Sequence, residues 1–142
     1  MTAGIEISGA EEMLAEGEGY FRVVERSYLK PKVFTPEIVH NLLSMSMEKF
    51  SMAILMHQGL LPENHAFDDL VNALKAVVPM SAEIESALLA LDAESDLCSL
   101  EIRKSQIPGP ERMAMLIGIG CKLRDAAVDS VRGGNDFPLH LE

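Results

Sequence analysis

The fold is decided by the stretch TPEIVHNLLSMSMEKFSMAILMHQG, which spans residues 35–59. Thr35 is a preferred N-cap, Pro36 suits the first helical position, and Glu37 favours the positive end of the helix dipole. Gly59 is typical of the residue that ends a helix. Apolar side chains recur between these ends at Leu42, Met45, Phe50, Met52, Ala53, Ile54 and Met56. This helical spacing predicts one long helix that packs into a core.

The methionines of this helix admit other interpretations. Thioether sulfurs bind soft metals such as Cu(I), but such a site needs several sulfurs that converge on one point. Methionine also fills irregular gaps in cores and is common at subunit interfaces. The helical spacing favours the core. A membrane anchor is not predicted, because the charge-free apolar run at 50–62 is too short to cross a bilayer.

Four further helices are predicted around this one, at residues 10–29, 66–78, 81 to 92 or 100, and 111–131. Proline and glycine mark the breaks between them, at Pro31, Pro79, 107–110 and 133–134. No segment alternates apolar and polar residues as a half-buried strand does. We therefore predict an all-α, up-and-down bundle of four main helices, with the shorter helix at 66–78 as a fifth.

The first and last helices differ in how they use glycine. The first presents an apolar face at Met13, Tyr20, Phe21, Val24 and Tyr28. Gly17 and Gly19 weaken this helix, each by up to about 1 kcal/mol relative to alanine. In the last helix, Gly118, Gly120 and Ala126 leave room for a close neighbour.

The chain has 142 residues, which fits one domain with a hydrophobic core. We place the bundle at residues 10–132, with a flexible lead at 1–9 and a tail at 133–142 whose last two residues resemble a tag remnant. The formal net charge of −10 disfavours nucleic acid and anionic lipid as partners, since their phosphates are repelled. Cys98 and Cys121 form no CxxC pair, and the first residues do not form a signal peptide. We therefore expect a cytoplasmic protein that does not enter a membrane.

Glu37 and His40 form an ExxH pair, the unit that di-iron bundles use to bind metal. Such a site needs a second ExxH pair, and no other histidine of the chain has a glutamate at that spacing. We therefore predict no metal or other cofactor, with Glu37 stabilising the helix N-terminus and His40 at the surface. A metal-binding bundle that uses Glu37 and His40 is kept as an alternative.

A basic cluster at Arg103 and Lys104, with Arg112 nearby, precedes the last helix. This cluster suits a phosphate, although cations of a solvated turn look the same in a sequence. No GxSxG, P-loop, HExxH or GxGxxG motif is present, so we predict no catalytic residues.

The order of these features is similar to that of the HEPN domain, a small all-α module. The similar positions are Met47, Glu48, Lys49, Ala53, Leu55, Gly59, His65, Phe67, Leu70, Leu74, Arg103 and Pro108. The resemblance implies a helical bundle that forms a homodimer. Members of the family include RNases, partners of a small nucleotidyltransferase, and binding modules.

RNase members of the family carry an arginine followed closely by a histidine, and this chain departs from that pattern. After Arg103 the corresponding positions hold Pro108, Gly109 and Pro110, so the general base of the reaction is missing. The resemblance therefore implies a non-catalytic binding or adaptor module that partners a nucleotidyltransferase or binds a nucleotide.

The groove of such a module is expected at Lys49, His65, Asp69, Arg103 and Lys104. The alternative from a different class is an enzyme, a degenerate nuclease or nucleotide-handling protein that uses His65 together with Arg103.

Overall fold

The structure of the chain is a computed structural model that describes residues 9–60, 67–95 and 109–133. These residues form five α-helices and one short 3-10 helix, and none of them belongs to a strand. The elements are α1 (Ala10–Arg26), η1 (Ser27–Leu29), α2 (Pro36–His57), α3 (Phe67–Lys75), α4 (Ala82–Ser95) and α6 (Pro110–Arg132). The prediction of an all-α bundle is confirmed. Apart from Gly9 and Gly133, the predicted lead and tail lie outside the described residues.

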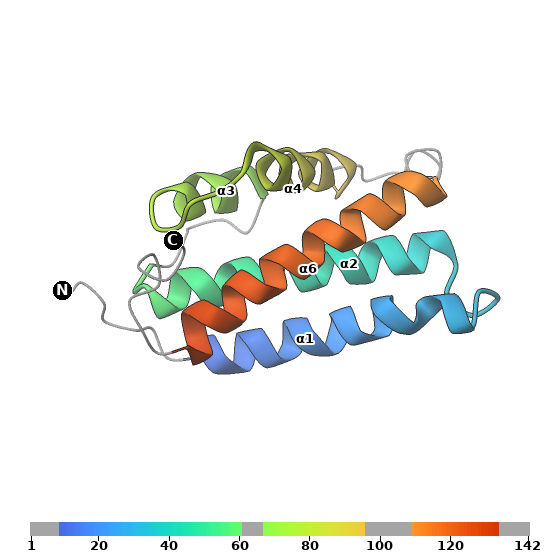
Figure 1. Ribbon diagram of the computed structural model, residues 1–142, viewed down its shortest axis with the longest axis horizontal. Helices are drawn as coiled ribbons and strands as arrows, with labels where there is room; N and C mark the ends of the chain where they lie inside the picture. The colour runs from blue at the N-terminus through green and yellow to red at the C-terminus, as the bar shows by residue number, and fades with distance from the viewer. Residues whose placement is uncertain (1–8, 61–66, 96–108, 134–142) are drawn as a thin grey trace.

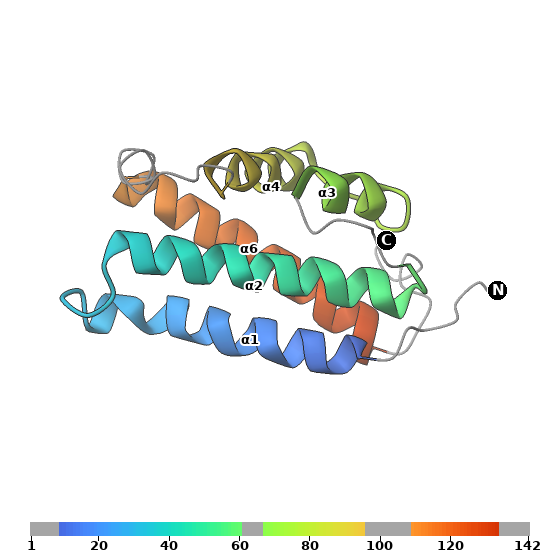
Figure 2. The same cartoon turned by 180° about the vertical axis from the view of Figure 1, so that it is seen from behind.

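The four longer helices alternate in direction along the bundle, as the colour gradient in Figure 1 shows for α1, α2, α4 and α6. Helix α1 packs along α2, and α6 packs against both of them. The short helix α3 pairs with α4, and this pair covers α2 and α6 on the side opposite α1 (Figures 1 and 2). The chain therefore has the predicted up-and-down order, with α3 as the shorter fifth helix.

Both ends of α2 form as the sequence predicts. The hydroxyl oxygen of Thr35 accepts a hydrogen bond from the amide of Ile38 at 3.4 Å, and Pro36 occupies the first helical position. At the other end, Gly59 has a φ of 81°, which L side chains rarely adopt. This conformation lets the Leu60 amide donate to the Leu55 carbonyl at 2.8 Å and close the helix.

The centre of the bundle is the second half of α2, where every residue from Phe50 to Met56 is buried. Helices α1, α3 and α6 all contact α2, and a helix surrounded in this way is apolar on all sides. Met52 and Met56 lie in the core as predicted, but Met45 is 40 % exposed, and Met47 is buried instead. The apolar stripe predicted for this helix was too narrow, because the prediction assumed that neighbouring helices cover only one face of α2.

Two fully buried serines on α2, Ser46 and Ser51, are compatible with this core because their hydroxyls bond within the helix. The hydroxyl of Ser46 donates to the Leu43 carbonyl, and that of Ser51 donates to the Met47 carbonyl, both at 2.8 Å. Neither hydroxyl is left unsatisfied, so burial carries little penalty.

Two glycines set the distances between the long helices. A Cβ added at Gly17 of α1 would lie 2.9 Å from ring atoms of Phe50, and one added at Gly120 of α6 would lie 2.7 Å from Phe21. The rings of Phe21 and Phe50 meet edge to face, with their centroids 5.9 Å apart. The close approach predicted for Gly120 is confirmed, whereas Gly17, predicted only to weaken α1, is also a packing position.

The buried face of α1 differs from the predicted one. It consists of Ala10, Leu14, Gly17, Phe21 and Val24. Tyr28, predicted on the apolar face, is 75 % exposed and belongs to η1. The prediction was wrong at this position because α1 ends at Arg26, so the spacing of the α-helix no longer decides where Tyr28 points.

Helix α3 ends at Lys75, earlier than the predicted end at residue 78. Ala76 and Val77 donate to carbonyls three residues back, at 3.2 and 2.9 Å, so the chain leaves the helix in a tight turn. Pro79 disfavours helical geometry at Val78, which accounts for the turn before it. Ser81 then caps α4, accepting a hydrogen bond from the amide of Ile84 at 3.2 Å, as its position in the sequence predicts.

Candidate binding site

The groove predicted at Lys49, His65, Asp69, Arg103 and Lys104 is described only in part. His65, Arg103 and Lys104 lie outside the described residues. Asp69 is half-buried on α3. The ammonium of Lys49 lies 2.9 Å from a carboxylate oxygen of Glu16, and the hydrogen bond between them raises the pKa of Lys49. Lys49 thus joins α2 to α1.

The Glu37–His40 pair sits at the start of α2, where Glu37 is half-buried and in the first turn. His40, predicted at the surface, is only 4 % exposed. It lies between the buried residues Val39 and Leu43 on a helix that is covered on several sides, so the surface prediction was wrong. Within residues 9–60, 67–95 and 109–133, no three His, Cys, Asp or Glu side chains gather where they could share a metal ion.

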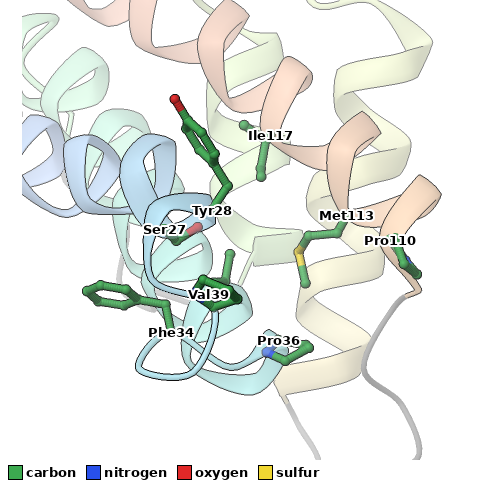
Figure 3. A pocket seen from close by; sticks show the side chains of 9 residues that line it. Ser27, Tyr28, Phe34, Pro36, Val39, Pro110, Met113 and Ile117 are labelled. Atoms are coloured by element: carbon green, nitrogen blue, oxygen red, sulfur yellow. The ribbon is translucent and has the colours of Figure 1, made fainter.

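A different part of the molecule forms an open cavity of about 270 Å³. It lies at the end of the bundle where α1 turns into α2 and where α6 begins (Figure 3). One side of its wall is built by the α1–α2 connection, through Tyr28, Pro31 and Phe34. Pro36 and Val39 of α2 continue this wall. The sequence reasoning assigned no role to this place.

The opposite wall of the cavity comes from α6. Met113 and Ile117 face Tyr28 and Val39 across the open space, and Pro110 lies at the helix start (Figure 3). The remaining wall residue is Ser27. Its hydroxyl donates to the carbonyl of Val24 at 2.8 Å. The cavity therefore offers its occupant an almost wholly apolar wall.

Local chemistry holds this wall in place without an occupant. The amides of Val33 and Phe34 both donate to the carbonyl of Lys30, at 3.0 and 2.9 Å, which closes the connection into a tight turn. Prolines at positions 31, 36 and 110 fix their own φ angles at the points where the chain enters and leaves the wall. A wall fixed in this way loses little conformational entropy when a ligand binds.

The segment that builds one wall of the cavity also exposes several large apolar side chains. Leu29 is 62 % exposed and Val33 is 58 % exposed, and Ile38 on the first turn of α2 is 41 % exposed. Together with Tyr28 they give the segment 28–38 four exposed apolar side chains. Exposed apolar side chains on a segment that also lines a cavity are typical of a surface that binds a partner or a ligand.

The surface around this cavity also carries cations, namely Arg26, Lys30, Lys32 and Arg112. Arg26 directly precedes Ser27, Lys30 and Lys32 flank Pro31, and Arg112 precedes Met113. The basic concentration predicted from the sequence was Arg103 and Lys104, with Arg112. The signal that was missed is the run from residue 22 to 32, which holds four cations and one carboxylate in an acidic chain.

Comparisons of the chain with protein-family models, with curated proteins and with solved structures find no match. None of the helices in the described part of the chain is both long enough and apolar enough to cross a bilayer. The candidate site is therefore described by its own geometry, an apolar cavity whose wall segments also carry exposed apolar side chains and cations.

Proposed function

We propose that this chain is a non-catalytic binding module of the HEPN type that holds an apolar group of its partner in the cavity between the α1–α2 connection, α2 and α6. The observation that carries the proposal is the cavity itself, about 270 Å³ in volume and lined by apolar side chains from three segments. Burial of an apolar group there gains roughly 25 cal/mol for each Å² removed from water.

The size of the cavity indicates what kind of group it holds. Pockets for drug-sized ligands usually enclose about 300–1,000 Å³. A cavity of about 270 Å³ is better matched to one large aromatic or aliphatic side chain. Interfaces commonly use such anchors, because a buried aromatic side chain in a central pocket contributes much of the binding energy.

The cavity is tested with a neutral apolar probe, N-phenyl-1-naphthylamine, whose fluorescence rises in apolar surroundings. We expect the probe to bind the wild-type chain and to bind Ile117→Trp at least about tenfold more weakly, because the indole occupies the cavity. Met115→Trp is the matched control, since Met115 lies on the same helix, is exposed and does not line the cavity.

Equal probe binding by Ile117→Trp and wild type would contradict the proposal, as would the absence of any binding to wild type. Thermal unfolding of each variant is followed by circular dichroism, so that a folding defect is not mistaken for loss of the cavity. If Ile117→Trp does not fold, Ile117→Phe places a smaller ring at the same position.

The HEPN resemblance adds a homodimer and a nucleotidyltransferase partner to the proposal. What supports them is the all-α, up-and-down fold together with the sequence positions that resemble the family. Sedimentation velocity of the purified chain tests the homodimer, which is expected to form at micromolar concentration. Incubation with labelled RNA tests whether the chain is non-catalytic, and no cleavage is expected.

A further inference from the structure

The lysines and arginines of the described residues divide into two groups. One group forms ion pairs with carboxylates at 2.7 to 3.1 Å, and its members are Lys49, Lys75, Lys122, Arg124 and Arg132. The other group forms no ion pair within the described part of the chain, and its members are Arg22, Arg26, Lys30, Lys32 and Arg112. The division is therefore equal in number, five against five.

The division is also spatial, because the second group lies at one end of the bundle. Arg22 and Arg26 lie on the last turns of α1, Lys30 and Lys32 in the connection to α2, and Arg112 in the first turn of α6. Lys30, Lys32 and Arg112 lie on the segments that build the apolar cavity, and Arg22 and Arg26 lie just before the first of these segments in the chain. We call the five side chains the basic rim.

Few carboxylates lie on the same segments, residues 22–37 and 109–113. They are Glu25, Glu37 and Glu111, and Glu25 is already bound to Arg124 at 3.1 Å. The segments thus hold five cations and three carboxylates, whereas the whole chain holds 12 cations and 22 carboxylates. An acidic molecule that carries a local basic rim attracts anions to that rim and repels them elsewhere.

We infer that the cavity takes an acidic segment of a partner protein, with one large apolar side chain in the cavity and aspartate or glutamate residues on either side of it. This inference rests on the function proposed above and adds the chemistry of the partner. The apolar anchor fills the cavity, and the flanking carboxylates pair with the basic rim. The exposed side chains of Leu29 and Val33 cover the apolar part of the bound segment.

Other occupants fit these observations less well. A second copy of this chain that docks through the same end in a two-fold contact brings the basic rims face to face, and like charges repel. The homodimer proposed above therefore uses another face. A bilayer offers a broad surface with no single group to fill a concave cavity. An extended nucleic acid reaches beyond the basic rim, and its further phosphates meet repulsion from the rest of a molecule with a net charge of −10.

The test uses two pools of short synthetic peptides with a central Phe, Trp or Leu. The flanking positions hold Asp and Glu in one pool and Asn and Gln in the other. Fluorescence polarisation is expected to show that the acidic pool binds wild type about tenfold tighter than the amide pool, with the difference shrinking as salt is added. Replacing the central residue by Ala is expected to abolish binding of the acidic pool.

A charge-reversed variant identifies the surface. Lys30→Glu combined with Lys32→Glu is expected to remove the preference for the acidic pool and to create one for a third pool with Lys and Arg flanks. Lys75→Glu combined with Lys122→Glu changes the net charge equally but alters paired lysines on α3 and α6. This control is expected to keep the wild-type preference.

Equal binding of the acidic and amide pools would overturn the inference, as would an unchanged preference in the Lys30/Lys32 variant. Binding of phosphatidylserine vesicles in place of the peptides would assign the basic rim to a lipid surface and overturn it too. If N-phenyl-1-naphthylamine binds wild type while the acidic pool does not, the inference fails and the proposed function stands. If neither binds, both fail.

Discussion

The middle of the bundle and its cavity end contrast in how their side chains find partners. In the middle, the gap at Gly120 is filled by the ring of Phe21, and the cation of Arg124 lies 5.3 Å from the centroid of that ring and pairs with Glu25. At the cavity end, Tyr28 and Leu29 are exposed and the neighbouring cations have no ion pair within the described residues. In the middle of the bundle, these side chains find their partners within the chain. At the cavity end, the exposed apolar side chains and the cations are left to contact another molecule.

The largest expected difference between the two regions is between their aromatic side chains. Phe21→Ala removes a ring that is buried against Phe50 and Gly120, and we expect a loss of about 3–5 kcal/mol in the free energy of unfolding. Tyr28→Ala truncates an exposed side chain and is expected to change that free energy by no more than about 0.5 kcal/mol. Urea denaturation measures both, and similar losses at the two positions would remove the contrast.

A smaller effect, with opposite signs, is expected at two glycines of α6. Gly120→Ala forces its Cβ against the Phe21 ring, and overpacking of this kind costs about 1–3 kcal/mol, offset in part by the better helix propensity of alanine. Gly118 has nothing within 4 Å of an added Cβ, so Gly118→Ala is expected to stabilise the chain by up to about 1 kcal/mol. The same denaturation experiment compares them. Stabilisation by both substitutions would show that α6 is not packed closely on α1.

The smallest expected effect concerns the ion pairs between α1 and α6 at the end of the bundle opposite the cavity. Arg132 of α6 lies 2.7 Å from Glu11 and 2.8 Å from Glu18 of α1, and its hydrogen bond lowers the pKa of Glu11 from the ordinary value of 4.5. The carboxylate of Glu11 therefore stabilises the folded chain above pH 4.5, and this contribution is lost as the pH falls through the lowered pKa.

The measurement is the melting temperature of wild type and of Glu11→Gln between neutral pH and pH 3. Wild type is expected to be slightly more stable at neutral pH, with the difference vanishing at the acid end because both side chains are then uncharged. Glu12→Gln is the control, since Glu12 is exposed on the same turn and forms no ion pair within the described residues. A difference that grows on acidification would contradict the assignment.

The helices were predictable because their signals are local. Thr35, Pro36 and Gly59 mark the ends of α2 through the chemistry of single residues and their immediate neighbours. The predicted faces were less accurate, since the face of a helix depends on what packs against it. Met45 was predicted in the core and is exposed, while His40 was predicted at the surface and is buried.

The candidate site was not predicted. The cavity joins Tyr28 and Val39 to Met113 and Ile117, residues far apart in the chain that carry no motif. Only the cations at Arg22, Arg26, Lys30 and Lys32 left a visible signal in the sequence, as a basic run in an acidic chain. The groove expected from the HEPN resemblance stays a prediction, since His65, Arg103 and Lys104 lie outside the described residues.

The sequence by itself determined that the chain is helical and where most of its helices begin and end, because caps, prolines and apolar spacing act over a few residues. Only the tertiary structure decided that Gly17 is a packing position and that the start of α6 faces the α1–α2 connection. These facts depend on contacts between residues distant in the chain. The cavity and its basic rim arise from such contacts, which no local pattern encodes.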